Sequence, residues 1–216
     1  SYSISKTNCQ SKTINLLLDS ISKSMKLNEK AFLIYKLFNS AFTGLSIGIL
    51  FTIYQPLDPS IHSIGGMALA LGMLILAKFY YKILNLKSFF KISVFVEIII
   101  LSTLLFFLFL QYSLLSALLI YCGYQITFIF GGYLVRAETL VANDKAFLGK
   151  IDVNKQIGYL IGLAISYIFY KALEHGINIK DTKVQISLLH YLLLSLQCLI
   201  ILLLLRSFIW EENIKK

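Results

Sequence analysis

Charged residues, proline and cysteine are all scarce in this chain. Only 14% of its 216 residues are charged and 57% are hydrophobic, whereas about a quarter of the residues of a soluble domain are charged. The two prolines lie together at Pro56 and Pro59, which argues against many short strands joined by turns. The apolar stretches do not alternate with polar residues, as the strands of an outer-membrane β-barrel do. The composition therefore predicts an all-α integral membrane protein.

The sequence also lacks the motifs of an enzyme or a metal protein. Its three cysteines, Cys9, Cys122 and Cys198, form no CxxC pair and no other metal-binding spacing. No HExxH, GxSxG or Walker loop is present, and no acidic pair has the spacing of metal ligands. We therefore expect no enzymatic activity, no cofactor and no bound metal.

Six apolar segments are candidates for membrane-spanning helices. They cover residues 31 or 37 to 54, 61–77, 92–110, 114–135, 157–170 and 184–205. The fifth is only about 14 residues long, below the roughly 20 that a span needs, so we expect its helix to begin earlier, near residues 148–152. The short polar run Gln111-Tyr112-Ser113 predicts a tight turn that makes the third and fourth spans antiparallel neighbours. The predicted transmembrane domain covers residues 31–208.

The segments outside this domain are predicted to be tails. In residues 1–30, apolar side chains recur at helical spacing, with lysines elsewhere around the helix, which indicates either a helix lying on the membrane surface or a mobile tail. The apolar positions are Ile14, Leu17, Leu18, Ile21 and Met25. A second, short tail covers residues 209–216.

Basic residues gather on one side of the predicted bundle. The loops at 78–91 and 136–156 hold eight Lys and Arg residues, whereas the opposite side holds only Lys171, Lys180 and Lys183. Because basic loops stay on the cytoplasmic side, both termini are predicted to be cytoplasmic, in a multi-pass protein of the cytoplasmic (inner) membrane. This bias accounts for the net charge of +9 better than nucleic-acid binding does, so we expect no nucleic acid as a partner.

Glu97 is the one carboxylate placed well inside a predicted span. A charge there costs a few kcal/mol or more unless it is paired or hydrated. We expect its partner to be Arg136, Lys78 or Lys82. Two interpretations stay open: a structural ion pair that latches the cytoplasmic side, or a carboxylate that couples proton movement to transport.

Other polar side chains lie along faces of the first and fourth spans. Tyr121 and Gln125 share one helical face, with Tyr124 beside it, and buried Tyr and Gln side chains need partners. Asn39 and Thr43 form a similar stripe in the first span. Each stripe is either a substrate surface or a set of hydrogen bonds between helices.

Small residues four apart predict close helix packing in two spans. Gly44 and Gly48 are so placed in the first span, and Gly158 and Gly162 in the fifth. Such spacing allows two helix backbones to approach each other closely in a membrane.

The order of these parts resembles one half of a major facilitator superfamily transporter. The likeness covers about residues 31–208 and rests on six spans with both ends inside, a basic and aromatic loop between spans 2 and 3, the run Arg136-Ala-Glu138-Thr-Leu-Val after span 4, and the small-residue start of span 5 at Gly158 and Gly162. Lys82 stands where the family's loop usually has an Arg, the Asp of that motif is absent, and no proline follows Gly162.

The resemblance implies a secondary transporter that moves a small solute by alternating access, as a homodimer or with a second half. In that family, spans 1 and 4 line the cavity, which implies a substrate pathway along the two polar stripes. From the residues themselves we expect a charge latch or a coupling role for Glu97, Arg136, Glu138 and Lys82. Membrane lipid is the other expected partner. The alternative is a membrane subunit, scaffold or receptor that keeps the bundle without transporting.

Overall fold

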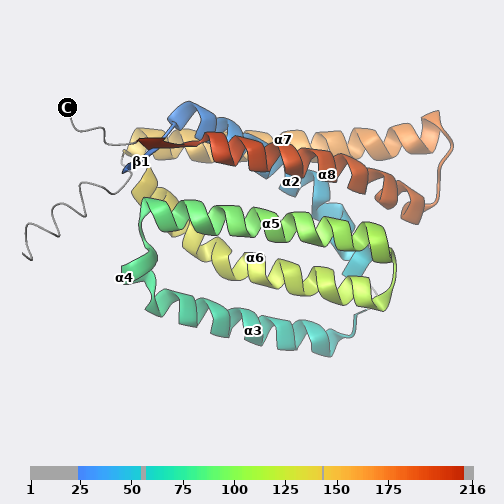
Figure 1. Cartoon of the computed structure of the whole chain (residues 1–216). Coiled ribbons are helices and arrows are strands. Elements are labelled where there is room, and N and C mark those ends of the chain that lie inside the picture. Colours follow the sequence, from blue (N-terminus) through green and yellow to red (C-terminus); the bar gives the residue numbers. More distant parts are fainter. Residues whose placement is uncertain (1–23, 55–56, 143, 212–216) are drawn as a thin grey trace, which may run out of the picture.

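The computed structural model describes residues 24–54, 57–142 and 144–211, which form a bundle of long helices with a two-stranded ribbon at one end (Figure 1). In chain order the elements are β1 (Ser24–Leu27), α2 (Glu29–Tyr54), α3 (Pro59–Lys78), α4 (Tyr80–Ile83), α5 (Leu86–Leu110), α6 (Leu114–Val141), α7 (Lys145–Gly176), α8 (Thr182–Arg206) and β2 (Phe208–Glu211). Within these residues, six helices are long and apolar enough to cross a membrane. The predicted multi-pass helical architecture is confirmed at this level.

Five of the six long helices begin before the apolar runs that predicted them. The side chains of Asn28, Asn85 and Asp144 each accept a hydrogen bond from a backbone N–H in the first turn of α2, α5 and α7, at 3.2, 2.9 and 3.0 Å. A side chain in this capping position stabilises the start of a helix. The predicted starts at residues 31 or 37, 92 and 148–152 were therefore too late, because the caps lie in polar sequence outside the apolar runs.

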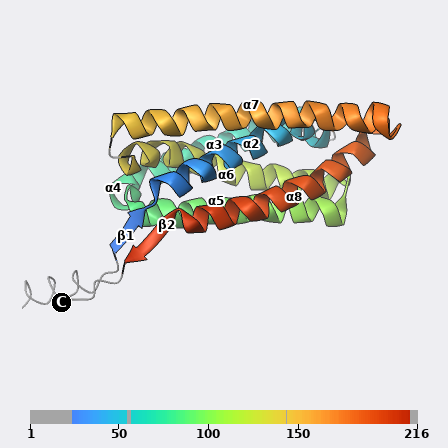
Figure 2. The same ribbon diagram turned by 90° about the horizontal axis from the view of Figure 1, so that it is seen from above.

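The ribbon joins the two ends of the described chain. β1 and β2 are antiparallel, with Met25 opposite Trp210 and Leu27 opposite Phe208. Met25, the last residue of the amphipathic pattern predicted for the first tail, thus lies in a strand, and the other four residues of that pattern lie outside the described residues. The ribbon marks one end of the bundle, named here the strand end, and the opposite end is the far end (Figure 2).

Successive long helices run in opposite directions between these two ends (Figure 1). The turn at residues 111–113 connects α5 to α6, and the two helices pack along each other as predicted. Gln111 in this turn has a φ of 48°. With six long helices, the first starts and the last finishes at the strand end.

The packing of the six long helices follows an internal repeat. α2 packs against α7 and α8, α6 packs against α3 and α5, and α5 packs against α8. If α2 is exchanged with α6, α3 with α7 and α5 with α8, the same set of helix pairs results. α2 starts at the strand end and α6 at the far end, so the two triplets have inverted orientations. We name this arrangement the inverted repeat.

Glycines allow the close approach of α2 and α7. Gly44 of α2 and Gly158 and Gly162 of α7 lie where the backbones meet, and a Cβ added at Gly162 would collide with the carbonyl group of Ala41. Gly48, predicted for the same packing face, has open space where its Cβ would be. The α2–α7 contact is therefore backbone against backbone over about two turns, as in other small-residue contacts between membrane helices.

Gly162→Ala is expected to destabilise the protein by about 1–3 kcal/mol, because the new methyl group forces the two backbones apart. Gly149→Ala is the matched control: it lies in the same helix with open space around it, and alanine favours a helix by up to about 1 kcal/mol over glycine. Thermal unfolding in detergent, followed by circular dichroism, measures both variants. Equal melting temperatures for the two would contradict the close α2–α7 contact.

Candidate functional site

Glu97 of α5 lies buried in the half of the bundle nearer the strand end, with only 2% of its surface exposed. Its Oε1 atom accepts hydrogen bonds from the hydroxyl of Tyr35, at 2.7 Å, and from the side-chain amide of Asn39, at 2.8 Å, both on α2. Its Oε2 atom accepts one from Nε2 of Gln197 on α8, at 2.7 Å. Three uncharged side chains from two other helices therefore hold this carboxyl group.

Glu138 of α6 forms a second buried acidic site, and here the partners are cations. It makes ion pairs with Lys36 of α2 and, at 3.2 Å, with Lys155 of α7. The side chain of Lys36 is 9% exposed and that of Glu138 is 4% exposed, whereas Lys155 is 28% exposed. The Lys36–Glu138 pair is thus enclosed by protein, and Lys155 closes it toward the surface.

The two acidic sites meet on α2, where Tyr35 and Lys36 are neighbours in sequence. We name the whole set the buried polar network: Tyr35, Lys36, Asn39, Glu97, Glu138, Lys155 and Gln197. It connects α2, α5, α6, α7 and α8, which is every long helix except α3. Its two carboxyl groups and two ammonium groups give a formal charge of zero when both carboxyl groups are ionised.

The network differs from the charge pairing expected for Glu97. Among the described residues, the structure pairs this carboxyl group with no Lys or Arg within 4 Å. The guanidinium group of Arg136 lies over the ring of Tyr80, 5.8 Å from its centroid, and the Lys82 ammonium group lies 5.4 Å from the ring of Tyr81. Arg136 is two residues from Glu138, and residues so spaced point to different sides of a helix.

Tyr35, Lys36 and Gln197 were not singled out from the sequence. Lys36 lies inside α2, near the start of the first predicted span. Its signal was a lysine with apolar residues on both sides, which in a span demands an acidic partner. Gln197 likewise stands out as an amide in a very apolar segment, but its partner is 100 residues away in sequence.

Two of the predicted pathway residues lie on α2. Asn39 belongs to the buried polar network through its bond to Glu97. Thr43 is exposed, and its hydroxyl donates to the backbone carbonyl of Asn39 at 3.3 Å. The structure therefore places one residue of this stripe inside the bundle and the other on its surface.

The other three pathway residues lie on α6. The Tyr121 hydroxyl donates to the backbone carbonyl of His62 on α3, at 3.3 Å. Tyr124 and Ser46 border a hollow between α2, α5, α6 and α8 that holds only about 10 Å³. Gln125 has a buried Oε1 atom with no hydrogen-bond partner among the described residues. Tyr121 therefore serves the α3–α6 contact, and Gln125 carries unused hydrogen-bonding capacity.

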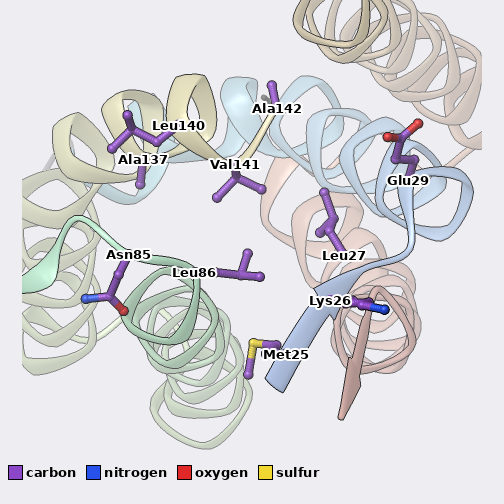
Figure 3. Close-up of a pocket in the computed structure, with 10 residues that line it drawn as sticks. All are labelled: Met25, Lys26, Leu27, Glu29, Asn85, Leu86, Ala137, Leu140, Val141 and Ala142. Atoms are coloured by element: carbon purple, nitrogen blue, oxygen red, sulfur yellow. The ribbon is translucent and has the colours of Figure 1, made fainter. Parts of the chain in front are cut away.

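A larger pocket of about 440 Å³ opens at the strand end (Figure 3). Its walls combine apolar and polar side chains and come from β1, the starts of α2 and α5, and the end of α6. The lining residues are Met25, Lys26, Leu27, Glu29, Asn85, Leu86, Ala137, Leu140, Val141 and Ala142. Figure 3 shows Leu86 and Val141 projecting toward each other from opposite walls. None of the five predicted pathway residues borders this pocket.

No metal site accompanies these features in residues 24–54, 57–142 and 144–211, where no three His, Cys, Asp or Glu side chains are grouped closely enough to hold an ion. The buried polar network holds two carboxyl groups and two ammonium groups inside the bundle. Its ion pairs and carboxyl group bridge helices from both halves of the inverted repeat.

Glu138→Leu is expected to cost about 3–5 kcal/mol of stability, because it leaves the enclosed Lys36 without a counter-ion. The double variant Lys36→Met/Glu138→Leu is expected to recover most of that loss, since apolar replacement of a whole buried pair is often neutral. Lys155 stays partly exposed in both variants and also lies 3.6 Å from Asp152. Thermal unfolding in detergent distinguishes the cases. A double variant no more stable than the single one would contradict an enclosed ion pair.

Comparison with known proteins gives no relative for this chain. No protein-family model matches it, no curated protein matches it, and no solved structure matches it. Its function must therefore be inferred from its own sequence and geometry.

Proposed function

We propose that this chain is one six-helix half of a secondary transporter that moves a small solute across the cytoplasmic membrane by alternating access. The working unit is a homodimer or a pair with a second half. The single observation that carries the proposal is the inverted repeat of the six long helices. Such repeats recur in secondary transporters, including nested triplets within each half of the major facilitator superfamily.

The contents of the repeat interface support this role. In transporters with such repeats, solute and ion sites lie between the repeats. Here the buried polar network joins Tyr35, Asn39 and Glu97 of the first triplet to Glu138 and Gln197 of the second. Ionisable groups inside a membrane protein are costly, and they mark ion or substrate pathways more often than they serve packing alone.

The exposed faces of the bundle are compatible with a second bundle beside it. α3 packs mainly against α6 and leaves large apolar side chains uncovered. These are Ile64, Met67, Leu71, Met73, Leu74 and Ile75. Both lipid and a second half satisfy such a surface, and a rocking transporter needs the second half.

A non-transporting subunit, scaffold or receptor remains the second candidate because of one specific observation. The hollow between α2, α5, α6 and α8 holds about 10 Å³, room for one water molecule at most. A hollow of this size is too small for a solute. Transport therefore requires either a space between two bundles or a rearrangement of this one.

A solute-release experiment tests transport. Proteoliposomes are loaded with a mixture of amino acids, sugars, nucleosides and organic acids, and the released solutes are measured by mass spectrometry. We expect faster release of at least one class than from protein-free liposomes. Gln125→Ala is expected to slow that release about tenfold, as the loss of one hydrogen bond of ~1.4 kcal/mol does.

Ile126→Ala is the matched control, since Ile126 is the next residue in α6 and its side chain is exposed on the outside of the bundle. This variant is expected to release solute at the parent rate. Equal release from the Gln125→Ala protein would remove the site assignment. Failure of every solute class in the mixture to move would favour the non-transporting alternative.

The charge distribution predicts that the strand end faces the cytoplasm. In a background without the native cysteines, Lys183→Cys at the far end is expected to react with a membrane-impermeant maleimide on intact cells. Lys145→Cys at the strand end is expected to react only after permeabilisation. Both positions are exposed at helix starts. Labelling in the opposite order would reverse the orientation.

A further inference from the structure

The two buried carboxyl groups of the network have opposite kinds of partners. Glu138 is held by two ammonium groups, from Lys36 and Lys155. Glu97 is held only by hydroxyl and amide donors, and no Lys or Arg of the described residues lies within 4 Å of it. The two ammonium groups therefore stabilise the ionised form of Glu138, whereas no counter-ion contacts Glu97.

We propose that Glu97 is a proton-binding site, whose carboxyl group takes up one proton from water and releases it again while Glu138 stays ionised. Glu97 is 2% exposed, and a carboxylate enclosed without a counter-ion is costly compared with its neutral form. Its three hydrogen bonds offset part of that cost and stabilise the ionised form. Burial therefore favours the neutral form, and the three hydrogen bonds favour the ionised form.

A second observation points to the same atom. The side chain of Gln197 is fully buried, and its Oε1 atom has no hydrogen-bond donor among the described residues. Its Nε2 atom lies 2.7 Å from Oε2 of Glu97. A neutral carboxyl group is a donor as well as an acceptor. Protonated Glu97 therefore has an O–H donor close to the unpaired Oε1 acceptor of Gln197. A half turn of the Gln197 amide brings that acceptor to the carboxyl group, at the loss of the 3.0 Å hydrogen bond that Nε2 donates to the backbone carbonyl of Glu97.

Charged and titratable groups on the neighbouring helices interact with the Glu97 carboxyl group. From α2, Tyr35 donates to it and Lys36 acts on it electrostatically. From α6 and α7, Glu138 and Lys155 act through their pairing with Lys36. α8 contributes the non-ionisable Gln197.

While Glu97 is ionised, Lys36 is attracted by both carboxylates, although it pairs directly only with Glu138. After protonation of Glu97, Lys36 is held by Glu138 alone, and the attraction that draws α2 toward α5 weakens.

Resting on the proposed function, this site identifies the coupling ion as a proton. The proton enters or leaves at the place where α2, α5 and α8 meet. Its binding changes the contacts between the two triplets of the inverted repeat, which are the parts that must move in alternating access.

Infrared difference spectroscopy of the protein in lipid vesicles tests the site without any solute. On passing from alkaline to acidic buffer, the parent protein is expected to gain a carbonyl band of a protonated carboxyl group in an apolar environment. Glu97→Gln is expected to lose this band. Glu174→Gln, which alters an exposed carboxylate at the far end, is expected to keep it. A band that persists in Glu97→Gln, or that is absent from the parent across the acidic range, would overturn the proposal.

Gln197→Leu keeps the test sharp should the Glu97 variant fold poorly. This change removes both the donor to the ionised form and the acceptor for the neutral form. The hydrogen bond to the charged form is the stronger of the two, so the titration midpoint of the band is expected to rise by about one pH unit, a tenfold change in proton affinity. An unchanged midpoint would also count against the proposal.

Proteoliposome release under an imposed pH gradient separates this site from the proposed function. A gradient-dependent release that Glu97→Gln abolishes supports proton coupling. Release at a rate independent of the pH gradient overturns proton coupling but is consistent with transport. No release, with the infrared band present, overturns transport and leaves the proton site in place.

Discussion

Charge inside an apolar bundle must be neutralised by other helices, and this requirement fixes how α2 sits among its neighbours. Lys36 is enclosed and pairs with Glu138 of α6, which also receives Lys155 of α7. Tyr35, one residue earlier, points to Glu97 of α5. Because neighbouring residues on a helix point in different directions, a shift of α2 by one residue breaks both sets of contacts at once. A few buried polar groups therefore specify the register of five helices.

The glycine contact makes this charge arrangement geometrically feasible. Gly158 follows Lys155 by three residues on α7, so both lie on roughly the same face of that helix. The missing side chain at Gly158 lets α7 rest on the backbone of α2. α7 is thereby close enough for Lys155 to reach Glu138 beside Lys36. Close packing and ion pairing thus depend on each other, since the apolar faces alone allow α7 to slide along α2.

The helices were predictable from sequence because membrane spans need long apolar runs, and each of the six long helices contains one. The starting residues of the helices were less predictable, since Asn85 and Asp144 act as caps only where a helix follows them. The interior position of Glu97 was also readable. The hydrogen-bond partners of Glu97 were not predictable, because a carboxylate in a span is bound by whichever helices pack against it. Gln197, for example, lies 100 residues away in the sequence. Tertiary arrangement, rather than local pattern, decides such contacts.

The packing of the two triplets is symmetric, but the chemistry of the two ends of the bundle is not. At the strand end the helices are held by buried ion pairs and carboxyl contacts. Toward the far end, the ring of Phe107 stacks on that of His190 with centroids 3.7 Å apart, and Tyr112 donates to the backbone of Lys183 at 2.9 Å. Separating stacked rings exposes apolar surface, whereas separating ion pairs demands new partners for each charge. In the proposed alternating cycle, the strand end therefore opens only with a change in protonation or charge pairing, while the far end opens against ring packing and a hydrogen bond.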